Sequence, residues 1–197
     1  SSAASDVYKR QVDGLIVDTS DLSLTGTKIS IQNTGLRWVS TGGHPPETTA
    51  RRPATGGTPP YTYTPLDTRI VSLDGDLIIG EGNGATTITV SDRSGPSATF
   101  NGFVSNVIRL IVSPTYDHNQ AVAWIRSMNG GTISKDSLVI SSINIQYRLS
   151  PTSNLAWQFG IPVSTNAMGI VLGAPSSDHY YYTAYRYESF PCLAIAP

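Results

Sequence analysis

Short runs of apolar and β-branched residues, separated by turn residues, dominate the first half of the chain. Residues 56–95 show this pattern most clearly, because runs of strand length follow one another there with almost no helical periodicity. The pairs Asp-Gly at 74–75 and Asn-Gly at 83–84 interrupt the runs, and such pairs supply the positive φ angles of tight hairpin turns. Within residues 86–90, apolar and hydroxyl side chains alternate with a period of two, which predicts a strand with one buried face.

Strand character extends to both sides of this stretch. The chain closes the predicted β domain with residues 100–113, in which a dense apolar strand at 107–112 is expected to end at Pro114, because proline cannot donate to a ladder. Earlier strands are predicted at residues 15–17, 28–31 and 37–39.

Residues 40–60 are predicted to form a long loop, because Gly, Pro and Thr are too frequent there for a central strand. The loop carries His44, Arg51 and Arg52, which could contribute to a binding site. Solvated turn residues are the favoured interpretation, since loops generally run over the protein surface.

One set of residues in the central stretch carries a family resemblance: Asp67, Ile70, Ser72, Asp74, Gly84 and the run from Thr86 to Val90. In these residues the stretch resembles the bacterial group 2 immunoglobulin-like domain, a recurring spacer in bacterial surface proteins of the invasin and intimin type. The resemblance covers roughly half of the chain and implies an immunoglobulin-like β-sandwich. An unrelated sandwich with similar turn chemistry is the alternative, because many sandwiches share such strands.

The periodicity changes after Ser113. Residues 117–131 predict an amphipathic helix, with Asp117 or Asn119 as its N-cap and Gly130 at the left-handed position beyond its end. The apolar residues at helical spacing are Ala121, Trp124, Ile125 and Met128.

The next segment, residues 134–150, fits two structures. Ile140, Ile143 and Tyr147 would share one face of a helix, whereas Ile143, Ile145 and Tyr147 would share one face of a strand. Periodicity alone does not decide between them.

The C-terminal part resembles the C-type-lectin-like domain that terminates the invasin and intimin adhesins. The resemblance rests on a capped helix with a tryptophan, a second short helix, loops with Trp157 and a tyrosine-rich strand pair. It departs from the classical pattern because it has one cysteine and no triplet for calcium and sugar, so calcium-dependent sugar binding is not expected. The predicted fold class is mainly β, an immunoglobulin-like β-sandwich at residues 12–113 followed by a small α+β C-type-lectin-like domain at residues 114–197.

Residues 1–11 are expected to be a non-native or disordered leader, because they lack periodicity and resemble translated linker sequence. They also lack the apolar region of a signal peptide. The chain is therefore interpreted as a piece of a longer multi-domain protein that would carry its own export signal.

Charge and composition exclude several classes of partner. The formal net charge is −1 and only 14% of residues are charged, so neither nucleic acid nor an anionic membrane surface is indicated. No apolar run approaches the ~20 residues that span a bilayer, so this fragment is not expected to insert into a membrane. Cys192 is the only cysteine and cannot form an internal disulfide.

No pattern indicates catalysis, a metal or a cofactor. His44, His118 and His179 are far apart, with no carboxylate or cysteine at metal-ligand spacing. Asp74 and Asp76 are close in sequence, but a turn at this point accounts for both. The protein is therefore predicted not to be an enzyme.

Aromatic crowding near the C-terminus gives the candidate ligand-binding residues Trp157, Tyr181, Tyr185 and Tyr187. Residues 180–187 contain many of the tyrosines of the chain, and tyrosine offers large contact area and a hydroxyl at low entropic cost. Cross-strand core packing is the alternative, because aromatic residues favour strands in any protein.

The resulting hypothesis is a non-catalytic adhesion fragment, extracellular on a bacterial cell surface or virion, whose lectin-like tip binds a host or cell-surface protein or glycan. The alternative is a purely structural module of a larger bacterial surface or phage fibre protein.

Overall fold

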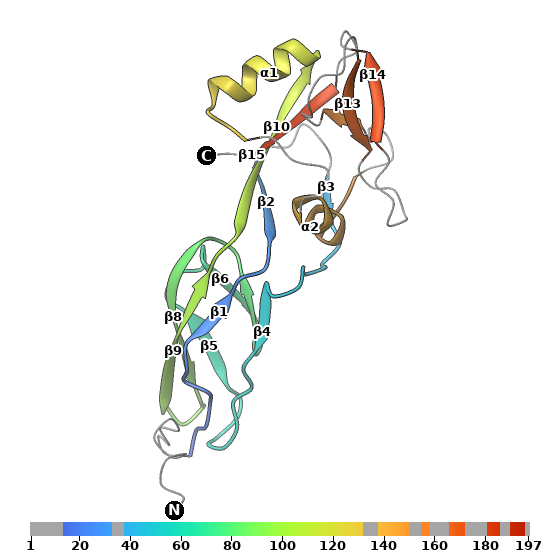
Figure 1. The fold of residues 1–197 in the computed structure, drawn as a ribbon. Helices are drawn as coiled ribbons and strands as arrows, with labels where there is room; N and C mark the ends of the chain where they lie inside the picture. Colours follow the sequence, from blue (N-terminus) through green and yellow to red (C-terminus); the bar gives the residue numbers. More distant parts are fainter. Residues whose placement is uncertain are drawn as a thin grey trace, which may run out of the picture. The chain divides into compact units, whose positions relative to one another are not determined.

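The computed structural model describes residues 14–32, 38–131, 138–149, 155–157, 166–171, 181–185 and 190–195 (Figure 1). Contacts divide the chain into two compact units, each made of two separate segments. Ser1–Thr27 and Pro46–Val107 form the first, which we call the sandwich unit; Lys28–Pro45 and Ile108–Pro197 form the second, which we call the C-terminal unit.

This division differs from the boundary expected between residues 113 and 114. It falls after Val107, and Lys28–Pro45 belongs to the C-terminal unit although it precedes most of the sandwich in sequence. The chain therefore passes from one unit to the other three times.

The sandwich unit contains two sheets. Strand β1 pairs with β9 in parallel, whereas β9 with β8, β8 with β5, β4 with β7 and β7 with β6 are antiparallel pairs. The four-stranded sheet has the order β1 (Leu22–Leu24), β9 (Ser97–Val104), β8 (Gly84–Ser91) and β5 (Thr62–Pro65), and the three-stranded sheet has the order β4 (Thr49–Arg51), β7 (Leu77–Gly80) and β6 (Val71–Asp74).

One hydrophobic core joins the two sheets. Ile88 from β8 and Phe100 from β9 belong to the same buried cluster as Val71 from β6 and Ile78 from β7. The inward positions of β8 alternate with less buried neighbours, as the two-residue period predicted. Two sheets that enclose one core confirm the mainly β, immunoglobulin-like sandwich.

Two turns differ in detail from the expected hairpins. The β6–β7 connection consists of Gly75 and Asp76, one residue later than predicted, and only Gly75 has a positive φ, at 59°. A positive φ at the first central residue alone is the requirement of a type II′ turn. Asn83 is not in a hairpin: its side-chain amide donates to the Val107 carbonyl at 2.9 Å and accepts from the Val107 N–H at 2.8 Å.

The predicted loop at residues 40–60 is partly wrong. Strand β4 lies inside it and pairs with β7, placing Ala50 opposite Ile78. Strand β1 was also not predicted from the sequence. Both strands have only three residues, too few to show a period, and only pairing with a distant strand defines them.

The C-terminal unit combines two helices with two sheets. The six-stranded sheet has the order β14 (Tyr181–Tyr185), β13 (Asn166–Val171), β12 (Leu155–Trp157), β15 (Phe190–Ile195), β10 (Val107–Tyr116) and β2 (Lys28–Gln32). Strands β11 (Tyr147–Leu149) and β3 (Trp38–Ser40) form a two-stranded sheet, and the helices are α1 (His118–Ser127) and α2 (Leu138–Gln146). Strand β10 runs through Pro114 instead of ending there, and its register with β15 shifts between Val112 and Thr115. A ladder irregularity is where a residue without an N–H is tolerated.

Helix α1 begins as predicted, with Asp117 as its N-cap. The Asp117 carboxylate accepts from the Gln120 N–H at 2.8 Å, and the Gln120 side chain accepts from the Asp117 N–H at 3.0 Å, which completes a capping box. Beyond the helix, Asn129 takes the left-handed conformation that had been expected at Gly130. The buried face packs Ala121 and Ile125 against Ala194, with Tyr116, Trp124 and Met128 around them.

The ambiguous segment forms both of the predicted structures in succession. Helix α2 ends at Gln146, and strand β11 begins at the next residue. The buried Gln146 side chain accepts from the Ile29 N–H at 2.8 Å and donates to the Ile29 carbonyl at 3.1 Å, so it continues the hydrogen bonding of β2 as a strand would.

A shortened chain provides a test of the discontinuous sandwich. In this shortened chain, an Asn-Gly turn joins Thr27 to Pro46, and the chain ends after Val107. Both segments of the sandwich unit are therefore kept. The Gly26 N–H already donates to the Glu47 carbonyl at 3.1 Å, so a two-residue turn can connect the ends. We expect a cooperative thermal melt by circular dichroism.

The control is the continuous fragment 14–107, which keeps Lys28–Pro45 but lacks α2, β11 and all of β10 after Val107, the elements that this segment pairs with or bonds. It should melt at a similar temperature, but a protease should cut it first within Lys28–Pro45. If only the continuous fragment folds, Lys28–Pro45 belongs to the sandwich core.

Candidate functional site

The described candidate aromatic residues lie in one sheet, on two strands that flank β13. Trp157 is the last residue of β12, and Tyr181 and Tyr185 are the first and last residues of β14. Strand β13 pairs with both β12 and β14. Trp157 was expected in a loop, and the structure corrects this, because it pairs with Gly169 on one side and Cys192 on the other. Tyr187 lies outside the described residues.

The strand register separates the candidate residues into two sets. Trp157 and Tyr182 both pair with Gly169, so the three form one row across the sheet. Tyr181 and Tyr185 alternate with Tyr182 along β14. Residues in one row share a face of a sheet, whereas adjacent residues in a strand lie on opposite faces. Trp157 therefore shares its face with Tyr182, and Tyr181 and Tyr185 occupy the other face.

The chemistry of these three strands is neutral. Their sequences are LAW in β12, NAMGIV in β13 and YYTAY in β14, with no acidic, basic or histidine residue. None of these residue types is charged at its ordinary pKa near neutral pH. Aromatic rings, hydroxyls and an amide instead provide apolar contact and uncharged hydrogen bonds.

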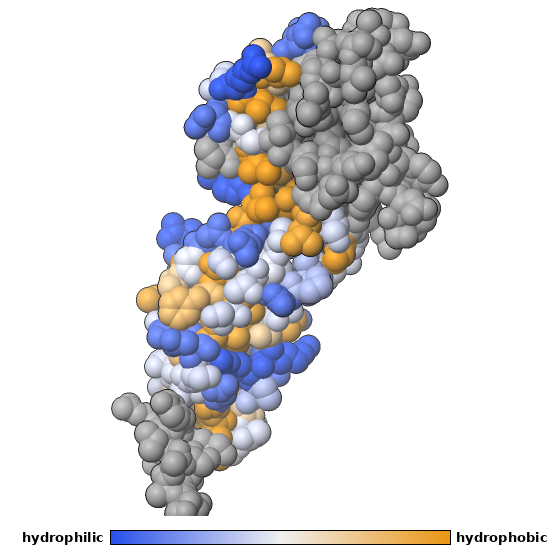
Figure 2. Space-filling view, viewed as in Figure 1, coloured by the Kyte–Doolittle hydropathy of each residue, from blue (hydrophilic) through white to orange (hydrophobic). Residues whose placement is uncertain are grey.

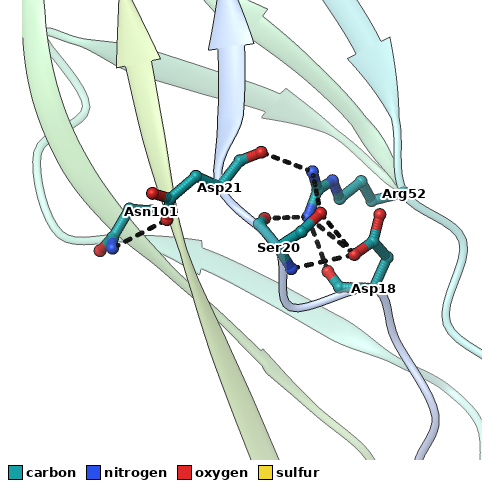
Figure 3. Close-up of polar contacts among 5 residues, drawn as sticks. All are labelled: Asp18, Ser20, Asp21, Arg52 and Asn101. Atoms are coloured by element: carbon teal, nitrogen blue, oxygen red, sulfur yellow. Dashed lines mark hydrogen bonds and ion pairs between the residues drawn. The ribbon is translucent and has the colours of Figure 1, made fainter. Parts of the chain in front are cut away.

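Arg52 is the residue that sequence reasoning placed wrongly. It was expected in a solvated loop, but only 8% of its surface is exposed. The Nη1 atom donates to the Asp18 carbonyl at 2.8 Å and also to the Ser20 carbonyl, while Nη2 donates to the Asp21 carbonyl at 3.3 Å (Figure 3). The guanidinium lies 4.7 Å from the centre of the Phe100 ring.

The surroundings of Arg52 show that this cluster is structural. Its own carbonyl accepts from the Tyr63 hydroxyl at 2.6 Å, and burial raises the pKa of that tyrosine. The exposed Asp18 carboxylate accepts from the Ser20 hydroxyl and N–H, which, with the nearby Arg52 charge, lowers the pKa of Asp18. Because both terminal nitrogens already hold the backbone before β1, the arginine fixes that segment to the core.

The other charged residues of the predicted loop are exposed. His44 is exposed, and the Arg51 guanidinium pairs with the Asp76 carboxylate at the β6–β7 turn. Arg51 is thus exposed and Arg52 is buried, because successive residues at the end of a strand point to opposite faces of the sheet.

Two carboxylates are engaged in turns. Asp67 accepts from the Arg69 guanidinium at 3.0 and 2.7 Å and from the Arg69 N–H at 2.9 Å, which lowers the pKa of Asp67 to about 2. Asp92 accepts from the N–H groups of Thr58, Ser94 and Gly95, and the bond from Thr58 is the largest cause of its lowered pKa. Within the described part of the chain, no three His, Cys, Asp or Glu residues gather in a way that could hold a metal ion.

The described part of the chain exposes few large hydrophobic residues. Figure 2 shows hydrophilic and near-neutral residues mixed with smaller hydrophobic areas on the viewed face. The exposed large hydrophobic residues are Ile16, Leu66, Phe103 and Leu138. Neither described helix has the length and apolar character needed to cross a bilayer.

Comparisons found similarity to solved structures only. No family model and no curated protein matches the chain. A crystal structure of an intimin–Tir90 complex is 14% identical, with 92% of this chain and 98% of that chain covered and a TM-score of 0.49. An intimin mutant of EHEC O157:H7 is 15% identical, with 74% and 83% covered and a TM-score of 0.46.

A third similar structure is a C-terminal 282-residue fragment of intimin in complex with the intimin-binding domain of the translocated intimin receptor. It is 14% identical to this chain, and the match covers 87% of this chain and 59% of that chain, with a TM-score of 0.49. At these identities and TM-scores, the functional conclusions have to come from the residues of this chain.

Proposed function

We propose that this chain is a non-catalytic recognition fragment of a bacterial surface protein. The sandwich unit acts as a spacer, and the C-terminal unit, an α+β domain of C-type-lectin-like character, presents the β12–β13–β14 sheet to a protein or glycan of another cell. The observation that carries the proposal is the presence of aromatic residues on both faces of three consecutive strands that contain no charged residue, with Trp157 on β12 and Tyr181 and Tyr185 on β14.

The chemistry of the sheet supports binding over catalysis. Tyrosine and tryptophan are the residue types most enriched among interface hot spots, because their rigid rings contribute contact area at low entropic cost. With hydroxyl and amide groups but no acidic, basic or histidine side chain, the strands can select a partner by shape and neutral hydrogen bonds. The turn carboxylates of the sandwich unit fit a spacer, because Asp67 and Asp92 already accept bonds from the backbone N–H groups of Arg69 and Thr58.

The register indicates which substitutions to compare. Tyr181→Ala and Tyr185→Ala alter one face of β14, whereas Tyr182→Ala alters the face shared with Trp157. We expect one of these two sets to weaken binding by about 1 to 4 kcal/mol, the range for interface hot spots, without lowering the melting temperature. The other set should lower the melting temperature and leave the affinity of the folded protein unchanged.

The measurement is binding of the full chain to glycan panels and to intact host cells, before and after protease treatment of the cells. Loss of binding after protease would identify a protein partner, and retention on glycan panels would identify a sugar. Binding should survive EDTA. If all three tyrosine variants bind as the unmodified chain does, or unfold without any binding being found, the structural-module alternative replaces the recognition proposal.

A further inference from the structure

The order in which the chain visits the two units has a mechanical consequence. Ser1–Thr27 belongs to the sandwich unit, but the chain then enters the C-terminal unit at Lys28 before it builds the rest of the sandwich. The long segment Pro46–Val107 leaves the C-terminal unit at one end and returns to it at the other. It is therefore a side branch of the covalent path from the N-terminus to the C-terminal unit.

Tension applied between the N-terminus and the C-terminal unit follows the shortest covalent path that is anchored at both ends. That path runs through residues 14–27 and reaches the C-terminal unit at Lys28. In a tandem pair connected by one linker, the whole first domain would lie in series with the force. Here Pro46–Val107 connects two points of the same unit, so tension on the direct path does not pull it open.

Strand β1, which lies on the direct path, can gain little length when it detaches. Strand β1, residues 22–24, is already extended, and a strand rises about 3.3 Å per residue, close to the limit of an extended chain. Detaching it from β9 would hardly lengthen the molecule, so an applied force does little work in favour of detachment. The Arg52 hydrogen bonds to the carbonyls of Asp18 and Ser20 hold the preceding residues to the sandwich as well.

The arrangement works only if Lys28–Pro45 stays attached to the C-terminal unit, and several contacts provide this anchor. The Gln146 side chain bonds both backbone groups of Ile29, and the Tyr147 hydroxyl donates to the Ile29 carbonyl at 3.2 Å. Further along, the Thr41 N–H donates to the Gln146 carbonyl at 2.9 Å, and β3 pairs with β11. The segment is thus held near both of its ends.

We propose that Lys28–Pro45 is a mechanical anchor that leads tension past the sandwich, so that the sandwich unit keeps its length under load until the C-terminal unit opens. This device would keep a spacer inextensible, whatever ligand the C-terminal unit binds. It depends on chain order and on the Ile29–Gln146 contact, not on the identity of the binding site.

Single-molecule force spectroscopy on the full chain, with handles at its two ends, tests the proposal. Unfolding Pro46–Val107 would release about 200 Å of chain, whereas unfolding the longer C-terminal segment Ile108–Pro197 would release about 300 Å. We expect the longer release first in every trace, and the release of about 200 Å only after it. Traces in which the shorter release comes first would overturn the proposal.

A second attachment point provides the matched control without any change to the core. Moving the N-terminal handle to the exposed Asp74, the last residue of β6, places the sandwich unit in series with the force. The sandwich should then open first and at a lower force. Identical traces from the two attachment points would refute the side-branch topology.

The anchor itself is tested by Gln146→Leu with end handles. Without the two hydrogen bonds to Ile29, Lys28–Pro45 should detach at lower force. In a fraction of traces, the release of about 200 Å from the sandwich unit should then come before the release of about 300 Å from the C-terminal unit. Thr89→Ala, on the less buried side of β8, serves as the control and should leave the order of events unchanged. An unchanged order in Gln146→Leu, with the variant shown to be folded by circular dichroism, would assign no anchoring role to this contact.

Discussion

Replacing Arg52 with alanine is expected to lower the free energy of unfolding of the sandwich unit by about 3 kcal/mol. The substitution removes a buried cation and leaves the carbonyls of Asp18, Ser20 and Asp21 without their donors. Hydrogen bonds to a charged group contribute about 1.5 to 3 kcal/mol each. Water replaces part of this contribution, because Asp18, Ser20 and Asp21 are exposed residues. The contact between the guanidinium and the Phe100 ring is lost as well.

Arg51 is the matched control, because it is the adjacent residue, has the same side chain and is exposed. Its ion pair with Asp76 lies at the surface, so Arg51→Ala should change the stability by less than about 1 kcal/mol. Urea denaturation followed by far-ultraviolet circular dichroism measures both variants. Tryptophan fluorescence would not report on the sandwich unit, because Trp38, Trp124 and Trp157 all belong to the C-terminal unit.

A third variant separates hydrogen bonding from packing. Arg52→Met keeps most of the apolar stem but has no donor, so it should remain nearly as unstable as Arg52→Ala if the bonds to the carbonyls dominate. Equal stabilities of Arg51→Ala and Arg52→Ala would contradict the buried position of Arg52.

Ile88→Ala is expected to destabilise the sandwich unit by about 3 to 4 kcal/mol, the cost of a large-to-small change in a close-packed core. Ile88 has no exposed surface and lies in the centre of β8. Its side chain fills the space that Gly102 leaves on the neighbouring strand, where an added Cβ would come within 2.9 Å of the Ile88 Cδ1 atom. The surrounding strands cannot collapse fully into the cavity, because their backbone is held by ladder hydrogen bonds.

Thr89→Ala tests the same strand on its other face. Thr89 is only partly buried, so the change should cost less than about 1 kcal/mol, within the range of strand propensity. The difference between the two variants in a urea titration measures the alternation of β8 directly. Similar losses for both would show that this strand does not present a single face to the core.

The strands of the sandwich could be predicted where their own residues carry a period. Residues 86–90 alternate in chemistry, and the structure places Ile88 and Val90 on the buried side. The start of α1 was predictable for the same reason, since Asp117 and Gln120 form a capping box from residues three apart. Strands of three residues, such as β1 and β4, contain no such signal.

The candidate aromatic residues show the same limit at the binding sheet. Crowding of tyrosines in residues 180–187 indicated a strand, and β14 is present there as Tyr181–Tyr185. Which face each residue shares with Trp157 depends on the register through Gly169, a glycine between two aromatic residues that gave no signal of its own. Whether these aromatic residues bind a partner stays a prediction.

By itself, the sequence determined the local elements: strands with a two-residue period, turns at glycines and a capped helix, because each depends on residues within a few positions of one another. Only the tertiary structure decided which of Arg51 and Arg52 is buried, and that Lys28–Pro45 belongs to the C-terminal unit. The physical reason is the distance between partners along the chain. Gln146 bonds Ile29 across 117 positions, and no local pattern marks a side-chain amide that replaces a strand.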